Sequence, residues 1–487
     1  MKKLLANYHA DPSHFDELIN QPDSPTIYQP FLDAITPLST DNFIRLNENA
    51  RLSFMNNGIT YALYSETESV EQVFPFDLIP RIINHTEWDM IERGVIQRNI
   101  ALNRFIKDVY NEGQILKDKV VPEHLVKSSV HYCELMEQFS PKKDIYCHIS
   151  GTDLIRHSDG QYYILEDNLR SPSGVSYVLS NRRAMQRTLP QALNSTHVES
   201  VSNYTDELLK MLWSVSGREL GNIFCVLLTP GVYNSAYYEH TFLAQKMGIE
   251  LVEGRDLYVN DDIVYLKTIG GDIRVDVIYR RIDDQFLDPK VFRKDSVLGV
   301  YGLMNAYIKG NVTIVNAPGT GISDDKAVCA YVPDMIKYYL GEDAILQNVP
   351  TYICEREKDL QYTLENMEQL VVKPVDMSGG YGVKICDQLT KMEIEDLKLE
   401  VKANPRNYIA QPKMLLSSHP TYIEDQKTIE PRHIDLRTFS IMGGDEPFVL
   451  KGGLTRTALT KGSLIVNSSQ GGGSKDTWVL NKNKYAS

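Results

Sequence analysis

The 487-residue sequence lacks three features that would each define a class of protein: a long apolar run, paired cysteines and an excess of basic residues. No stretch approaches the roughly 18–20 apolar residues that cross a bilayer. The N-terminus begins like a signal peptide, but Asp11, Asp16 and Glu17 arrive before an apolar core develops. We therefore expect a protein without a membrane span.

The cysteines and the charge balance narrow the class further. None of the six cysteines has CxxC spacing, so neither a zinc site nor a disulfide framework is predicted. They are Cys133, Cys147, Cys225, Cys329, Cys354 and Cys386. Acidic residues outnumber basic ones by 64 to 51, giving a net charge of −13, which argues against nucleic acid or an anionic membrane as the main partner. We expect a reduced, cytoplasmic protein with buried thiols.

Composition and hydrophobic pattern divide the chain into four parts. Residues 1–75 are polar and interrupted by prolines, which predicts an irregular N-terminal extension. Residues 76–205 carry a long helical pattern and a hairpin. Residues 206–310 read as a small α/β module, and residues 311–487 are rich in strands and glycine.

The second part begins with apolar residues spaced three and four apart, which predicts an amphipathic helix from a cap at Thr86 to near Gly113. Two strands over 145–155 and 162–165 follow, joined by a turn at 157–160.

The later parts alternate strands and helices. A strand at 223–228, a helix at 234–247 and a strand at 249–252 form a βαβ-like unit, and 275–282 is a further strand. The remaining predicted strands are 370–372, 408–410, 439–442, 448–450 and 463–466.

One group of residues has the chemistry of a magnesium site. Glu166 and Asn168 are two apart at the end of a strand, so they share a face, and Asp153 lies close if the hairpin pairs as predicted. Carboxylate and amide oxygens suit Mg²⁺, which takes water and phosphate oxygens for its other positions. The alternative is a polar turn after a hairpin strand. The loop at 170–174, with arginine, serines and glycine, favours a phosphate site.

A second group joins a strand to a glycine-rich loop. The strand at 370–372 delivers Lys373, and Gly379, Gly380 and Gly382 follow within ten residues. Glycines let backbone N–H groups approach phosphate oxygens, and lysine adds a compact positive charge. The spacing is not that of a Walker motif. The alternative is a hairpin turn with a surface lysine.

A third group lies near the C-terminus. Arg432 and Arg437 straddle a strand, so only one of them can face a given pocket, and Arg456 follows a glycine pair. Polar residues at 467–470 precede three glycines, which predicts a loop close to a ligand or another segment; a flexible linker is the alternative. We interpret His433 as structural. Asp324 and Asp325 resemble an acidic helix start, which leaves Lys326 either functional or a solvated side chain.

In combination, these segments resemble the circularly permuted ATP-grasp proteins of type 2, a bacterial group, and more distantly glutathionylspermidine synthase and eukaryotic-type glutathione synthetase. The resemblance runs from about residue 81 to 480. Its strings are 93–98 (RGVIQR), 165–170 (LEDNLR), 333–336 (PDMI), 372–374 (VKP) with the glycines after it, and 468–475 (SSQGGGSK). The metal-type residues precede the lysines, as permutation requires.

The resemblance implies an α+β and α/β fold in which two lobes grip ATP, beside a small Rossmann-like module. Lys326 and Lys373 match the phosphate lysines, and Gln411 matches the adenine hinge. The flexible loop corresponds to Ser378, Gly379, Gly380 and Gly382.

The resemblance also assigns metal and catalytic roles. Glu166 and Asn168 match metal ligands, and Asp153 matches the preceding metal aspartate. Asp376 is a competing candidate for the third ligand, shifted in spacing. Arg456 matches an arginine that contacts the acid substrate, and with Lys373 it forms the expected catalytic pair.

These roles imply an ATP- and Mg²⁺-dependent carboxylate–amine ligase that works through an acyl phosphate. The expected substrates are a small carboxylate and an amine or peptide, and the family context adds an all-helical partner protein. The alternative function is a nucleotide-binding regulatory or scaffold subunit without ligase turnover; a phosphotransferase with another acceptor is a third possibility.

Overall fold

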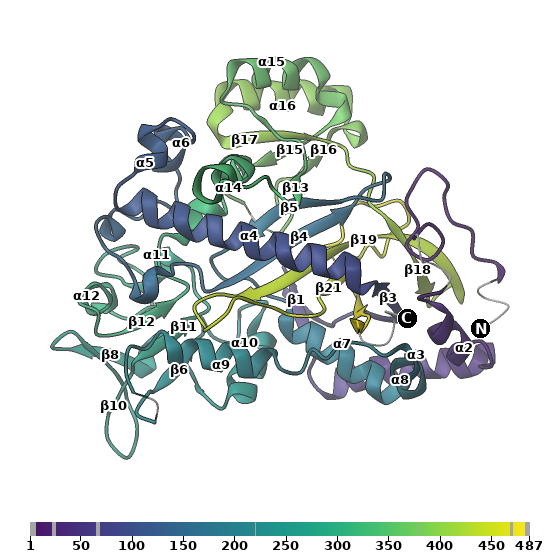
Figure 1. Ribbon diagram of the computed structural model, residues 1–487, viewed down its shortest axis with the longest axis horizontal. Coiled ribbons are helices and arrows are strands. Elements are labelled where there is room, and N and C mark those ends of the chain that lie inside the picture. Colours follow the sequence, from purple (N-terminus) through teal and green to yellow (C-terminus); the bar gives the residue numbers. More distant parts are fainter. Residues whose placement is uncertain are drawn as a thin grey trace.

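The computed structural model describes residues 6–21, 26–64, 69–219, 221–377, 379–467 and 471–482 (Figure 1). At its centre is a nine-stranded mixed sheet. Its strands are β3 (Phe76–Ile83), β4 (Ile149–Arg156), β5 (Tyr162–Asn168), β13 (Gln347–Asn348), β18 (Ser418–Ile423), β19 (Thr428–Ile441), β20 (Phe448–Val449), β21 (Leu454–Thr457) and β22 (Gly473–Val479). The order is β13-β5-β4-β19-β21-β22-β3, with β18 and β20 also paired to β19.

The predicted hairpin forms the middle of this sheet and is confirmed. β4 pairs antiparallel with β5, and Asp153 lies directly opposite Glu166. The turn between them contains Gly160 at φ +78°, a conformation that favours glycine. On its other side β4 pairs with β19, so both edges of β4 are hydrogen-bonded and every residue of β4 is buried.

The predicted long helix is α4 (His85–Tyr110), which crosses one face of the central sheet (Figure 1). Its buried residues Trp88, Ile91 and Val95 pack with strand residues of the sheet. The predicted cap at Thr86 was wrong by two residues. The side chain of Asn84 accepts a hydrogen bond from the Thr86 N–H, and Asn84 has the extended backbone of a cap.

A smaller lobe stands above the central sheet in Figure 1. Its antiparallel sheet has the order β14-β17-β15-β16 and is covered by two helices. These elements are β14 (Tyr352–Ile353), β15 (Leu370–Pro374), β16 (Lys384–Ile385), β17 (Tyr408–Pro412), α15 (Glu357–Asn366) and α16 (Lys391–Ala403). Val372, Ala410 and Leu397 share its core. The predicted strands at 370–372 and 408–410 are thus confirmed.

The predicted α/β module is present as a parallel four-stranded sheet in the order β12-β11-β6-β7. Its elements are β6 (Cys225–Leu228), β7 (Glu250–Val252), β11 (Val277–Arg280), β12 (Thr313–Val315), α9 (Tyr204–Ser214), α10 (Tyr237–Met247) and α12 (Leu303–Ile308). A three-stranded sheet adjoins it: β8 (Leu257–Asn260), β9 (Ile263–Leu266) and β10 (Ile273–Arg274). Because β12 belongs to this sheet, the module extends past residue 310.

The expectation of an irregular N-terminal segment was wrong. The segment contains α2 (Gln29–Ile35), α3 (Thr40–Asn56), β1 (Thr60–Tyr64) and β2 (Ser69–Val73). α3 begins three residues after Pro37, where the Ser39 side chain accepts from the Asn42 N–H. It buries Phe43 and Phe54. Prolines therefore set where helices start here without preventing them.

The predicted strand at 463–466 was also wrong, because these residues carry no strand in the structure. The strand of this region is β22, which begins at Gly473 within the stretch predicted as a loop. β22 pairs in parallel with β3, almost 400 residues away in sequence. Local sequence carries little information on such a pairing.

Within the part of the chain that the structure describes, no helix has the length and apolar character needed to cross a membrane.

The remaining α-helices connect these sheets. They are α5 (Gln114–Lys117), α6 (Glu123–Lys127), α7 (Val175–Thr188), α8 (Pro190–Thr196), α11 (Asp284–Leu287), α13 (Lys326–Cys329) and α14 (Val332–Leu340). All six cysteines are free and buried, as predicted.

Candidate active site

The residues predicted to bind nucleotide phosphates meet between the smaller lobe and the central sheet. Glu166, Lys326, Lys373, Gln411 and Arg456 line one cavity of about 130 Å³. They come from β5, α13, β15, β17 and β21, which are spread over almost 300 residues of sequence. Tertiary folding thus brings together groups that the sequence presents as separate motifs.

Lys373 is the more deeply buried of the two lysines of this cavity. Its Nζ donates to Gln411 Oε1 at 2.7 Å, and Gln411 Nε2 donates to Thr351 Oγ1 at 2.9 Å. Burial lowers the pKa of Lys373 to about 8; the negative charge of Glu166 opposes this shift, and the positive charge of Lys326 adds to it. The cation therefore has a neutral amide as its hydrogen-bond partner, which leaves its charge available to an anion.

Lys326 is the first residue of α13 and points to the same cavity. Its Nζ lies 3.8 Å from Glu166 Oε2 and donates to the carbonyl of Met377, at the start of the glycine loop. Its backbone N–H donates to the Val375 carbonyl at 3.0 Å. Lys326 is therefore a half-buried residue that touches both lobes, and the solvated-side-chain alternative is wrong.

The two aspartates before Lys326 fix this helix start in place. Asp324 accepts from the backbone N–H of Leu169 and from Arg170 Nε, both at 2.7 Å. Asp325 caps α13 through the Ala327 N–H and accepts from Arg406 Nη2 at 2.8 Å. Asp324 ties Lys326 to the strand end that carries Asn168, and Asp325 ties it to the smaller lobe. The sequence showed an acidic helix start but not these partners.

Asp153 has a different environment from the other predicted metal ligands. It is fully buried, and its two oxygens accept from Arg437 Nε at 2.6 Å, Arg437 Nη2 at 2.7 Å and Arg456 Nη2 at 2.8 Å. Burial alone would raise the pKa of Asp153, but the two arginines outweigh it and lower the pKa to about 2. Arg437 is thus the arginine of its strand that faces the site, while Arg432 pairs with Glu430.

Arg456 links Asp153 to a further acid that sequence reasoning had not singled out. Its Nε donates to Asp435 Oδ1 at 2.8 Å, and its Nη2 contacts both Asp435 and Asp153. Burial raises the pKa of Asp435, and the adjacent Arg456 opposes that shift. Asp435 lies directly opposite Arg456 in the β19–β21 pairing. That Asp435, three residues after Arg432, faces Arg456 becomes evident only once the strand register is known.

Glu166 and Asn168 keep oxygen atoms available for a cation. Glu166 is half-buried, and among the described residues its closest cationic contact is Lys326 at 3.8 Å. Asn168 uses its Nδ2 to donate to the Gly151 carbonyl at 3.2 Å, which leaves its Oδ1 for another partner. The described ranges contain no cluster of three or more histidine, cysteine or acidic residues arranged for a metal. One carboxylate with one amide oxygen still fits Mg²⁺, which keeps several waters and takes phosphate oxygens.

The glycine loop borders the cavity through Met377, Gly380 and Tyr381. Gly379, Gly380 and Gly382 have φ values of +69°, +79° and +71°, all in the left-handed region. Ser378 lies outside the described residues. Asp376, the competing candidate for the third ligand, is exposed. The pKa of Tyr408 is raised to about 12, by the burial of Tyr408, by its hydrogen bond to Glu400 and by the negative charges of Glu400 and Asp376.

His433 has the structural role predicted for it. Its Nδ1 lies 3.0 Å from the Leu416 carbonyl, and its ring packs against His14 with centroids 4.6 Å apart.

Lys475, from the glycine-rich stretch near the C-terminus, is fully buried and pairs with Asp77. From Gly473 on, this stretch therefore belongs to the central sheet, while residues 468–470 of the predicted loop lie outside the described residues.

The chain belongs to the circularly permuted ATP-grasp type 2 family, whose pattern it matches over residues 80–458. It is 48% identical over 472 residues to an uncharacterized protein of Synechocystis, covering 96% of this chain and 98% of that protein. It is 38% identical over 483 residues to a Frankia alni protein provisionally named glutamate–cysteine ligase 2-3, covering 98% of this chain but only 54% of that protein.

The fold has a counterpart among solved structures. A glutathione synthetase-like effector of Globodera pallida, solved in its apo form, superimposes with a TM-score of 0.60 at 13% identity. The match covers 94% of this chain and 99% of that one. At this identity it establishes the shared ATP-grasp type of fold, with its mixed helices and sheets.

Proposed function

We propose that this chain is an ATP-dependent carboxylate–amine ligase that uses Mg²⁺ and forms an acyl phosphate. Family membership supports an ATP-dependent ligase in general, and the name of the Frankia relative supports the joining of an acid to an amine. The observation that carries the proposal is the convergence of Lys326, Lys373 and Glu166 on one cavity beside Gln411. The two lysines neutralise nucleotide phosphates, and Glu166 with Asn168 holds the metal.

Mg²⁺ would neutralise charge on the phosphate oxygens and align them for transfer. The residues that fit it are Glu166 and Asn168. Asp153 would add a third oxygen only by giving up part of its contact with Arg437 or Arg456, since both of its oxygens accept from these arginines. Its more direct role is to fix the arginines, of which Arg456 borders the cavity.

The proposed reaction has two displacements. A carboxylate oxygen of the acid substrate attacks the γ-phosphorus of ATP, the bond to the bridging oxygen breaks, and ADP leaves. The amine nitrogen then attacks the acyl carbon, inorganic phosphate leaves with the electron pair of the C–O bond, and the nitrogen loses a proton. Lys326, Lys373 and Arg456 stabilise the charge that develops on the transferring group. This chemistry needs no nucleophilic side chain.

The glycine loop must move during such a cycle. Ligand pockets usually hold about 300–1,000 Å³, and the cavity holds about 130 Å³ with Met377 and Tyr381 on its border. Opening the loop admits the nucleotide, and closing it excludes water that would hydrolyse the acyl phosphate. The contact of Lys326 Nζ with the Met377 carbonyl is the one that nucleotide phosphates would replace.

The test is nucleotide turnover by the purified chain with Mg²⁺ and ATP, with and without a pool of amino acids, polyamines and short peptides. ADP, AMP and phosphate are measured separately. ADP and phosphate that increase with the pool support the ligase, and dividing the pool identifies the substrates. AMP would contradict the acyl-phosphate route. Tight binding of Mg²⁺-ATP without turnover would favour the nucleotide-binding subunit instead.

A further inference from the structure

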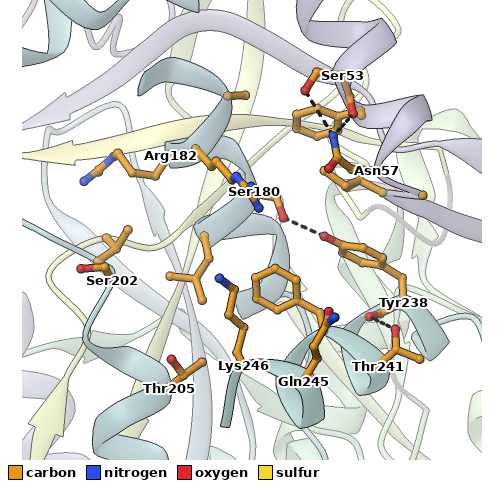
Figure 2. A pocket seen from close by; sticks show the side chains of 18 of the residues that line it. Ser53, Asn57, Ser180, Arg182, Ser202, Thr205, Tyr238, Thr241, Gln245 and Lys246 are labelled. Atoms are coloured by element: carbon orange, nitrogen blue, oxygen red, sulfur yellow. Dashed lines mark hydrogen bonds between the residues drawn. The ribbon is translucent and has the colours of Figure 1, made fainter. Parts of the chain in front are cut away.

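A second hollow, far larger than the candidate active site, lies between α3, α7, α10 and the segment 197–206. Its volume is about 1,620 Å³. It shares no lining residue with the nucleotide cavity. Figure 2 shows Ser53 and Asn57 on one side, Ser180 on a second, and Gln245 and Lys246 on a third, all around a common space. The proposed ligase reaction leaves this hollow without a role.

The two helices that wall the hollow are fixed to each other at their N-terminal turns. Glu239 of α10 accepts from the backbone N–H groups of Gly174 and Ser176, at 2.7 and 3.0 Å, where α7 begins. One turn further, the hydroxyls of Ser180 and Tyr238 are 2.9 Å apart (Figure 2). Arg281 anchors Glu239 from the strand side at 2.9 Å. These contacts therefore fix α7 and α10 to each other beside the hollow, which Ser180 and Tyr238 line.

Basic side chains gather along these walls although the chain as a whole is acidic. Arg183 and Arg187 of α7 and Lys246 of α10 line the hollow and are exposed. Among the described residues, none of the three has a carboxylate within 4.0 Å. Arg182, by contrast, is neutralised by Asp476 at 2.8 Å. Two arginines four apart on a helix repel each other unless an anion lies between or beside them.

The carboxylates of the lining lie on other segments. Glu71 of β2 accepts from the Thr60 hydroxyl, and Glu199 and Asp206 belong to the chain around the start of α9. The lining thus has a basic wall, formed by α7 and α10, and separate acidic positions. Although the chain has 13 more acids than bases, this wall presents three cations that have no carboxylate within 4.0 Å among the described residues, so it can hold the anionic groups of a ligand.

The rest of the lining indicates the size and type of that ligand. The lining also contains five side-chain amides and five aromatic rings: Asn57, Gln186, Asn194, Asn234, Gln245, Phe54, Tyr61, Tyr237, Tyr238 and Phe242. Amides exchange hydrogen bonds with peptide groups, and aromatic rings contact apolar side chains. The volume exceeds the usual range of about 300–1,000 Å³ for small-molecule pockets. We propose that the hollow binds an acidic polypeptide segment in extended form.

This inference does not depend on the ligase reaction, since it uses no residue of the nucleotide cavity. The probe is a fluorescein-labelled peptide of alternating glutamate and tyrosine, with glutamine–tyrosine and lysine–tyrosine peptides of the same length as comparisons. Binding is measured by fluorescence anisotropy on the full chain. The test variant combines Arg183→Gln, Arg187→Gln and Lys246→Gln. The control variant combines Lys294→Gln, Lys358→Gln and Lys402→Gln, three exposed cations outside the hollow, with the same change in net charge.

We expect the acidic peptide to bind the native chain, and the hollow variant to bind it at least about tenfold more weakly, because three charge contacts are lost. The control variant should stay within about twofold of the native chain, since exposed charges outside the site contribute little. Equal weakening in both variants, or equal binding of the three peptides, would overturn the proposal. Complete displacement of the peptide by inorganic phosphate or by ATP would assign the cations to a small anion instead, and would also overturn it.

Discussion

Lys373 is a buried cation whose hydrogen-bond acceptor, Gln411, carries no charge. In a folded protein such a lysine costs free energy unless an anion arrives to complete its environment. Its neighbour Lys326 increases this cost, and Glu166 offsets part of it. At the scale of single residues, the site is therefore arranged for a ligand that is more negative than the protein around it.

The lowered pKa of Lys373 predicts how activity depends on pH. The ammonium loses its charge as pH rises through about 8, so kcat/KM for ATP should fall above that pH, approaching about tenfold per unit. The measurement is the pH profile of ADP formation under limiting ATP. Lys373→Ala should lower turnover by about 100-fold or more, while Lys384→Ala, an exposed lysine of the same sheet, should leave it unchanged. A flat profile between pH 7 and 10 would contradict the assignment.

Asp153 and Glu166 should respond differently to the loss of their charge. Asp153→Asn takes the carboxylate away from Arg437 and leaves Arg456 with Asp435 alone, so it should lower the free energy of unfolding by about 3–5 kcal/mol. Glu166→Gln removes a half-buried carboxylate, so its effect on stability should stay within about 1 kcal/mol while Mg²⁺-ATP turnover is lost. Urea unfolding and ADP formation on both variants give the comparison. A stable but inactive Asp153→Asn would instead make Asp153 a metal ligand.

At the scale of elements, the glycine loop illustrates which details a pattern predicts. Three glycines after a strand predicted a loop near phosphates, and the structure places that loop at the border of the cavity. The pattern did not show which glycine is constrained by its neighbours. Gly382 is such a residue, since a Cβ there would lie 2.7 Å from Pro374 Cγ.

Gly382→Ala should therefore impair the loop more than the same substitution at a left-handed glycine without close neighbours. The added methyl group meets the Pro374 ring while the backbone stays in the left-handed region, so we expect turnover to fall by at least about tenfold with a raised KM for ATP. Gly248→Ala is the matched control, because its φ is +67° and a Cβ there meets nothing within 4 Å. Steady-state kinetics of both variants at several ATP concentrations decide the matter. Equal kinetics would show that the loop has room to adjust.

At the scale of the whole molecule, the N-terminal segment is joined to the C-terminal third. Glu17 is fully buried, and its carboxylate accepts from Arg81 Nη2 at 2.6 Å, Arg156 Nη1 at 3.3 Å and Ser417 Oγ at 2.9 Å. Its backbone N–H donates to the Ser418 carbonyl at 2.9 Å. Residues 412–418 connect the smaller lobe to the central sheet, so this contact braces the joint between the lobes.

Glu17→Ala should lower the free energy of unfolding by about 3–5 kcal/mol, because the buried Arg81 loses its carboxylate partner and Arg156 keeps only Glu87. Burial alone would raise the pKa of Glu17, but Arg81 and Arg156 keep it below its usual value. Its stabilising effect is therefore present at neutral pH and is lost as pH falls through that lowered pKa. Urea unfolding at neutral and acidic pH should show the gap from the native chain closing in acid. Glu48→Ala, an exposed acid on α3, should show no gap at either pH.

Local pattern by itself determined the parts of this protein that depend on neighbours in sequence. The long helix α4, the hairpin β4–β5 and the βαβ unit follow from periodicity and turn residues, and the motif order identified the permuted ATP-grasp family. Glu166 and Asn168 were predicted to share a face because strand side chains alternate. The helix, the hairpin, the βαβ unit and this shared face are each decided within about 30 residues of chain, whereas the motif order spans most of the chain.

Only the tertiary structure decided which charges meet. Asp153 pairs with Arg437 and Arg456, about 300 residues away, and β22 joins β3 across almost the whole chain. The arginines flanking Glu17 and the basic wall formed by α7 and α10 arise in the same way. Such contacts depend on the register of distant strands and on the packing of helices, and the free energy that selects them comes from burying the whole core at once. Short-range periodicity in the sequence therefore does not predict these contacts.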